Sequence, residues 1–198
     1  MLDQKEIQNI KKIKGEVRGV VFHTDLKYVE KVEGKGESED IVKAFKELEP
    51  EFEPEKIQNM KWYPLRWRVL LLLIIKKSFN WVEDDLYEMG RTAPTNSFMV
   101  KTLLKYFVGF EKTCREAPKY WNKHYNKGEL ELSKFDDKEK VVIYRLRDFD
   151  VHPVFCPYLT GYFQGIAELT NRGSTIRTKE TKCSFQNHPY HEYFIKWE

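Results

Sequence analysis

The stretch ETKCSFQNHPYHEYFIKW, residues 180–197, decides the fold of the C-terminal part of the chain. Polar side chains alternate with apolar or aromatic ones at both ends of the stretch, as they do in half-buried strands. The polar segment QNHP between them is typical of a short connection. We therefore predict two adjacent strands, over 174–185 and 190–197.

The sequence before this hairpin supplies the rest of a β-sheet. Residues 129–135 and 140–149 are rich in β-branched and apolar side chains, and the polar DDKEK segment between them suits a hairpin loop. Residues 153–171 form a helix candidate that ends near Gly173. The C-terminal order is therefore strand, strand, helix, strand, strand.

The N-terminal half has helical periodicity after one short predicted strand over 16–22. Its predicted helices cover 26–34, 39–49, 65–79, 82–93, 97–110 and 111–125. Gly90 suggests close packing in one of them. We predict an α+β fold, in which a helical N-terminal half packs on a four- to five-stranded antiparallel sheet. The chain is treated as one domain, 1–198, with its recognisable motif in 150–198.

The segment LRWRVLLLLIIKKSF, residues 65–79, is apolar on nearly all sides, which is typical of a central, buried helix. More apolar surface than one face of a monomer requires also predicts a homodimer. The alternative is that both sides of this helix are covered within the chain.

Composition limits the classes of function. The 198 residues carry 34 basic and 31 acidic side chains, a mixed surface that does not favour nucleic-acid binding. The N-terminus lacks a signal-like apolar stretch, and no apolar run approaches the roughly 20 residues that span a bilayer, so we expect a cytoplasmic protein without membrane contact.

Aromatic residues make up 15% of the chain, enough to line a ligand cavity as well as fill a core. We expect an apolar pocket between two of the predicted helices. Its predicted lining residues are Trp67, Leu71, Phe98, Leu103 and Phe107. The plain alternative is that these side chains belong to an ordinary core.

The opening stretch also carries residues that bind metals. Cys183 and His191 lie on the two arms of the predicted hairpin, and Glu180 lies three residues before Cys183. Residues three apart on a strand face opposite sides, so a bulge or a strand end must bring these two together. With Cys156, at the entry of the preceding helix, they make a sensible zinc shell. The alternative is a buried Cys acting as a small apolar residue, beside a surface His.

The segments CPYLTGYFQGIAEL, ETKC and QNHPYHEYFIKW resemble the 4-vinyl reductase domain, a small-molecule-binding module of bacterial and archaeal sensors. That family combines a Gly-rich helix, a Glu-x-x-Cys strand, a short turn, and a Cys before an aromatic strand. The resemblance implies a structural zinc ion. The ligands that it implies are Cys156, Glu180, Cys183 and His191.

Two positions depart from the pattern of this family. His191 stands where the family has its last Cys, and it is a zinc ligand of different reach. Asn187 and His188 replace the Gly-Asp of the turn. Asn tolerates a left-handed backbone, so the turn remains possible, while His188 competes with His191 as a ligand.

The helical part is similar, more loosely, to a wider superfamily that includes haem-based nitric-oxide sensors and TRAPP-type tethering subunits. A haem sensor needs an axial ligand, usually His. The candidates His23, His124 and His152 lie in no recognisable haem motif, and structural roles account for each, so we predict no haem.

The sequence contains no nucleophile elbow, P-loop or dinucleotide fingerprint, so we predict no enzymatic activity. We expect a non-catalytic sensor or regulatory domain that binds a small apolar or aromatic molecule and passes a signal to a downstream protein. One alternative is a TRAPP-like interaction subunit without a ligand, and a second is an accessory protein of tetrapyrrole chemistry.

Overall fold

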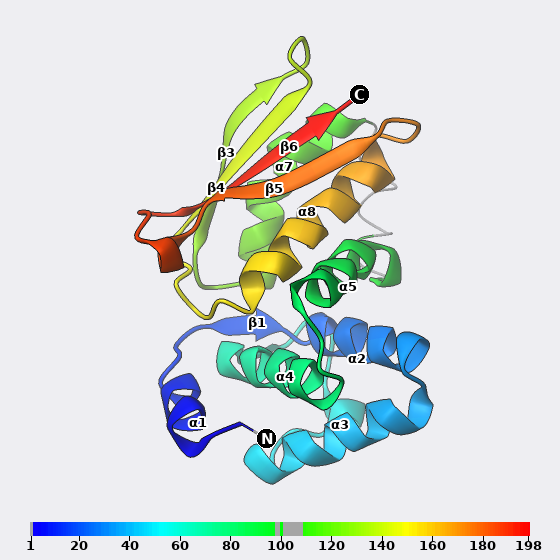
Figure 1. The fold of residues 1–198 in the computed structure, drawn as a ribbon, viewed down its shortest axis with the longest axis vertical. Helices are drawn as coiled ribbons and strands as arrows, with labels where there is room; N and C mark the ends of the chain where they lie inside the picture. The colour runs from blue at the N-terminus through cyan, green and yellow to red at the C-terminus, as the bar shows by residue number, and fades with distance from the viewer. Residues whose placement is uncertain (1, 98–99, 101–108) are drawn as a thin grey trace.

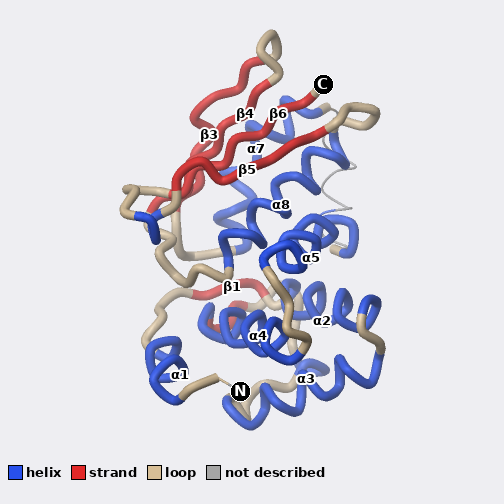
Figure 2. Tube along the Cα trace, in the orientation of Figure 1, coloured by secondary structure: helices blue, strands red, loops and turns tan. Residues whose placement is uncertain are grey.

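The computed structural model of the chain describes residues 2–97, 100 and 109–198. Figure 1 shows a helical lobe, formed by the elements from α1 to α4, below a sheet lobe, formed by the elements from α7 to β6. Helix α5, Glu83–Asn96, lies between the two. Figure 2 shows that most strand residues gather in the sheet lobe.

The helical lobe contains helices α1 to α4 and a small two-stranded sheet, β1-β2, of which β1 lies at the edge next to the sheet lobe (Figure 1). Its elements are α1 Gln4–Lys11, β1 Glu16–Arg18, α2 Val20–Val32, α3 Lys35–Leu48, the 3-10 turn Pro54–Lys56, β2 Trp62–Pro64 and α4 Leu65–Ser78.

The first predicted strand is wrong in length. It was expected over 16–22, but the strand ends at Arg18 and α2 begins at Val20. Gly19 lies so close to another segment that an added Cβ would be 2.4 Å from the carbonyl oxygen of Gln58. This tertiary contact turns the chain, and the β-branched valines that follow enter a helix despite their preference for strands.

The prediction of a central, buried helix over 65–79 is confirmed. Every side chain of α4 from Trp67 to Ile75 is buried, on all sides of the helix, within a single chain. The apolar character of α4 therefore gives no reason to expect a homodimer. The alternative, in which the chain itself covers this helix, is the arrangement observed.

The sheet lobe contains four antiparallel strands in the order β3-β4-β6-β5. They are β3 Glu129–Asp136, β4 Val141–Arg147, β5 Ile176–Lys182 and β6 His191–Trp197. Helices α7, Phe110–His124, and α8, Phe155–Thr170, cover one face of this sheet (Figure 1). The predicted α+β class and the strand-strand-helix-strand-strand order are confirmed.

Helices α5 and α8 touch through their backbones. A Cβ at Gly90 would lie 1.9 Å from the carbonyl oxygen of Tyr158, and one at Gly161 would lie 1.9 Å from that of Tyr87. Gly165 approaches Arg91 in the same way. The close packing expected at Gly90 is confirmed, and it joins α5 to the sheet lobe.

Two further sequence expectations concern a helix outside the described residues and the crossing of a membrane. The predicted helix over 97–110 lies mostly outside the described residues. None of the helices in the described part of the chain is long and apolar enough to cross a membrane.

Candidate functional site

A buried charge cluster joins the lobes. Arg68 of α4 donates to both carboxylate oxygens of Asp25 in α2, at 3.0 and 3.3 Å, and the two side chains are almost fully buried. The Tyr158 hydroxyl of α8 donates to Asp25 at 2.9 Å, and Arg68 also donates to the hydroxyl of Tyr125. Burial raises the pKa of Asp25, and the Arg68 guanidinium opposes that rise.

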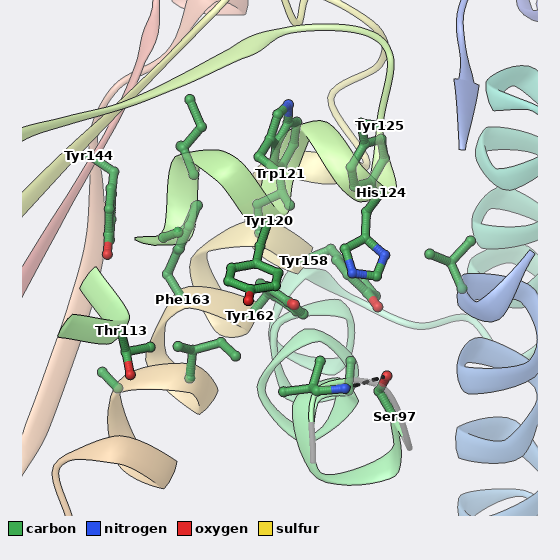
Figure 3. A pocket seen from close by; sticks show the side chains of 18 of the residues that line it. Ser97, Thr113, Tyr120, Trp121, His124, Tyr125, Tyr144, Tyr158, Tyr162 and Phe163 are labelled. Atoms are coloured by element: carbon green, nitrogen blue, oxygen red, sulfur yellow. Dashed lines mark hydrogen bonds between the residues drawn. The ribbon is translucent and has the colours of Figure 1, made fainter. Parts of the chain in front are cut away.

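Beside this cluster lies a cavity of about 130 Å³. Side chains from α2, α4, α5, α7, α8 and the inner face of the sheet line it, so both lobes contribute to its wall. Figure 3 shows the aromatic rings of Tyr120, Trp121, Tyr162 and Phe163 around the space. The volume is close to that of an engineered protein cavity of about 150 Å³ that binds benzene.

Two polar side chains of the cavity wall, those of His124 and Tyr162, are uncharged at pH 7. Burial, together with the cations Arg68, Arg18 and Lys123, lowers the pKa of His124 to about 4, so its imidazole is neutral at pH 7. Burial raises the pKa of Tyr162 to about 12, so its hydroxyl keeps its proton. Both residues line the cavity (Figure 3).

The residues predicted to line the pocket lie elsewhere or outside the described chain. Trp67 packs against Phe22, Phe52 and Tyr63 in the helical lobe, and Leu71 is fully buried there. Neither is among the described lining residues of the cavity. Phe98, Leu103 and Phe107 lie outside the described residues.

A signal for the observed wall was present in the sequence. In α7, the lining residues Cys114, Ala117, Trp121 and His124 recur three or four positions apart, which places them on one helical face. Periodicity marks such a face, but it does not tell whether the face meets another side chain or a void. Arg68, next to Trp67, reaches the cavity because one residue rotates the helix by about 100°.

The second site is the cluster at the C-terminal hairpin. One ligand atom from each of Cys156, Glu180, Cys183 and His191 lies within 4.8 Å of the others. The two Sγ atoms are 3.6 Å apart, and His191 Nδ1 lies 2.7 Å from Glu180 Oε1. Burial, followed by Glu180 and Cys183, raises the pKa of the Cys156 thiol.

Local backbone features bring these ligands together. The spacing required a bulge or a strand end, and both are present: the β5–β6 register shifts between Glu180 and Lys182, and β5 ends directly before Cys183. Asn187 has a left-handed backbone, with φ 65°, as its substitution for Gly predicted. His188 is exposed and lies outside the cluster.

Sequence reasoning missed one residue that orients this cluster. The Ser184 hydroxyl lies 2.7 Å from His191 Nε2, so the ring directs its other nitrogen, Nδ1, toward Glu180 and the thiols. Ser184 directly follows Cys183 in the chain. Its partner His191 lies eight positions after Cys183, and only the hairpin brings the two side chains together.

Comparison with known proteins places the fold. No family model matches the sequence, and no curated protein matches it. Solved structures do match. An H-NOX protein from S. oneidensis in the Fe(II)NO ligation state has a TM-score of 0.68 at 13% identity, covering 91% of this chain and 99% of that one. An oxygen-binding H-NOX domain related to soluble guanylate cyclases has a TM-score of 0.65 at 12% identity, covering 91% and 95%.

A third match is a structure concerned with modulating haem redox potential through porphyrin distortion, with a TM-score of 0.60 at 10% identity, covering 91% of this chain and 99% of that one. These matches show that the chain has the H-NOX fold. The wider superfamily and the narrower 4-vinyl reductase assignment, both suggested by the sequence resemblance, stay predictions.

The matching structures include haem proteins, so the size of the cavity matters for whether it can hold a haem. A haem is several times larger than benzene, whereas the cavity measures about 130 Å³. The rings of Tyr120, Tyr158 and Tyr162 occupy the surrounding space (Figure 3). His124 is the one imidazole among the described lining residues. The described residues therefore do not fit a haem without displacement of these tyrosines.

The other histidines considered for haem make local contacts. His23 Nε2 lies 2.8 Å from the carbonyl oxygen of Ile57, and His152 Nδ1 accepts the backbone N–H of Val154 at the entry of α8. Each of these two histidines therefore has a local contact within the described chain.

Proposed function

We propose that the protein is a non-catalytic sensor module that binds a compact, mainly apolar molecule in the cavity between its lobes. The observation that carries the proposal is this cavity, whose wall comes from both lobes. An occupant would touch α2, α7 and α8 at once. It would therefore favour one arrangement of the lobes, which a downstream protein could recognise.

Binding, rather than catalysis, suits the chemistry of the wall. The cavity contains one thiol, that of Cys114, among its described lining residues. Burial raises the pKa of Cys114 to about 11, so the thiol stays protonated near pH 7 and is a poor nucleophile. His124 and Tyr162 are likewise held neutral.

A thermal-shift titration with benzene tests the proposal. Benzene should raise the melting temperature of the wild-type protein, because a ligand that binds only the folded state stabilises it. Ala117→Leu should abolish this shift, because Ala117 lines the cavity and the larger side chain fills it. Ala44→Leu is the matched control, since Ala44 is also partly buried against the core but does not line the cavity. No shift in the wild type, or an equal shift in all three proteins, would sink the proposal.

We further propose that Cys156, Glu180, Cys183 and His191 hold one structural zinc ion. A tetrahedral site with Zn–S bonds of about 2.3 Å places two sulfurs about 3.8 Å apart. The Sγ atoms are already 3.6 Å apart, so the thiols need little movement. Four protein ligands would leave no open position for a substrate, so such a metal would be structural.

A buried hydroxyl without a partner lies on the strand that carries His191. Tyr193 pairs across the strands with Glu180, is fully buried, and its hydroxyl has no hydrogen-bond partner within the described chain. Buried hydroxyls usually have a partner.

Elemental analysis of freshly purified, untagged protein is the direct check on zinc. About one equivalent is expected, and Cys183→Ser should lower both the metal content and the melting temperature. Cys114→Ser is the control, because Cys114 is a buried thiol of the cavity wall, away from the cluster. Less than about a tenth of an equivalent in the wild type, with stability unchanged by a chelator, would mean that these residues form an ordinary hairpin.

The two alternative functions have less support. A ligand-free interaction subunit predicts a filled core and a large apolar surface patch. The large hydrophobic side chains exposed in the described residues are Val32, Met60, Val82 and Phe185, which lie on separate elements. A tetrapyrrole-handling protein needs a larger space than the observed cavity offers.

A further inference from the structure

None of the described helices lies on one face of the four-stranded sheet (Figure 1). Helices α7 and α8 cover the opposite face, where Tyr144 and Ile195 are buried. Successive side chains of a strand point to opposite faces, so Ile143 and Phe194 point to the uncovered side, and they are only partly buried. We call this side the outer face. It carries Ile143 of β4, Phe194 and Lys196 of β6, and Arg177 and Lys179 of β5.

The cations of the outer face differ in whether the protein neutralises them. Arg145 of β4 forms an ion pair of 2.9 Å with Glu192, its neighbour on β6. On the other side of β6, Arg177 and Lys179 of β5 pair with no carboxylate of the described chain. Lys196 donates to a backbone carbonyl oxygen at 2.6 Å and likewise has no carboxylate partner among the described residues. Positive charge without a counter-charge therefore gathers where β6 meets β5.

The strand register makes this arrangement costly. Arg177 lies directly opposite Lys196 in the antiparallel β5–β6 pair. Like charges in directly opposite positions destabilise a sheet. Lys179 lies opposite Phe194, with its Nζ 5.6 Å from the ring centroid, so it does not relieve the repulsion. An anionic partner that binds across β5 and β6 would remove a cost that the described chain leaves uncompensated.

Apolar side chains lie beside these cations. Ile143 of β4 is the cross-strand neighbour of Phe194, and both are half-buried. A partner therefore gains apolar contact in the middle of the outer face and complementary charge along its β5 side. Sheets commonly bury an apolar face against helices. A second copy of this chain does not fit through the same face, because two positive surfaces would meet and repel each other.

We propose that the outer face docks an amphipathic, acidic helix of a partner protein. The apolar stripe of that helix packs on Ile143 and Phe194, and its Asp and Glu side chains pair with Arg177, Lys179 and Lys196. The outer face belongs to the sheet lobe alone and lies on the side of the sheet away from the cavity. Docking here therefore does not depend on a filled cavity, and it adds to the proposed function.

Two synthetic helical peptides test this proposal. Both carry the same leucine stripe, which is flanked by glutamate in one peptide and by lysine in the other. Fluorescence anisotropy measures their binding to the full chain. The glutamate-flanked peptide should bind at least about tenfold more tightly, because each exposed charge contact is attractive in one complex and repulsive in the other. Added salt should weaken this complex, since exposed charges are screened.

Arg177→Glu separates binding from folding. The new carboxylate repels the glutamate-flanked peptide, so its affinity should fall about fivefold. The same carboxylate faces Lys196 as an opposite charge, so the urea midpoint of unfolding should rise. Lys27→Glu is the matched control, since Lys27 is an exposed lysine of α2 without an ion pair in the described chain. This variant should bind the peptide as the wild type does.

Equal binding of the two peptides to the wild type, or equal affinities of the wild type and Arg177→Glu, would overturn the proposal. A thymidine oligonucleotide and sedimentation test the rival occupants. Oligonucleotide binding that Arg177→Glu abolishes would assign the outer face to nucleic acid, and a wild-type dimer that this variant dissociates would assign it to a second copy. Either result contradicts an acidic helix. No cavity ligand enters these experiments, so their failure leaves the proposed function standing.

Discussion

Folding lowers the pKa of His124, and this change can be measured. Its pKa falls to about 4, mainly through burial and then through Arg68, Arg18 and Lys123, whereas an unfolded His titrates near 6.5. Between these values the unfolded chain binds more protons than the folded one. The stability that the neutral His124 allows is therefore full above about pH 6.5 and is lost as the pH falls toward 4.

His124→Gln should consequently flatten the decline in stability between pH 6.5 and 4.5. The free energy of unfolding is measured in urea at several pH values for the variant and the wild type. Parallel curves over this range would show that His124 is not protonated preferentially in the unfolded chain, and they would also remove the support for a neutral imidazole in the cavity.

Ser184 is predicted to act on the metal through His191. Its hydroxyl, 2.7 Å from Nε2, fixes the orientation of the imidazole. Loss of a group that orients a metal ligand typically weakens metal binding about 10–100-fold. Ser184→Ala should therefore raise the zinc dissociation constant by that factor in a competition titration with a chelator. Ser133→Ala, on the distant strand β3, should leave it unchanged; equal constants for all three proteins would exclude the orienting role.

At the scale of elements, the crossing of α5 and α8 depends on glycine. An added Cβ at Gly161 would lie 1.9 Å from the Tyr87 carbonyl oxygen, and backbone cannot move aside as a flexible side chain can. Gly161→Ala should lower the free energy of unfolding by at least about 2 kcal/mol, because the helices must separate.

Gly36→Ala provides the control for this helix crossing. Gly36 lies in α3, and a Cβ there would meet no atom within 4 Å. This substitution should raise the stability by about 0.5–1 kcal/mol, since alanine loses less backbone entropy in a helix. Urea denaturation measures both changes. A small effect of Gly161→Ala, similar in sign to that of Gly36→Ala, would mean that the helix contact is looser than described.

At the scale of the whole molecule, Asp25 and Arg68 of the helical lobe join the lobes through their hydrogen bonds to Tyr158 and Tyr125 of the sheet lobe. Arg68→Met leaves a buried carboxylate without its cation, which should cost about 3–5 kcal/mol of stability. The double variant Asp25→Leu/Arg68→Met should recover much of this loss, because no unpaired charge remains. Urea unfolding of the single and double variants gives the coupling energy. Additive losses would mean that the two side chains act independently.

Much of the architecture could be predicted from local sequence. Alternation in 174–197 predicted the hairpin β5–β6, and the unbroken apolar character of 65–79 predicted that α4 is buried. The three-residue spacing of Glu180 and Cys183 predicted a bulge or a strand end between them, and both are present. These features depend on how a residue relates to its near neighbours, which periodicity reports directly.

The remaining features were decided only by tertiary structure. The strand expected over 16–22 ends early because Gly19 meets Gln58, a residue that local propensity does not take into account. The cavity lies beside Arg68 rather than Trp67, since packing between lobes determines which apolar faces meet and which leave a void. The sequence by itself determined most of the described elements and their apolar faces. Contacts between residues far apart in the chain determined where the cavity lies.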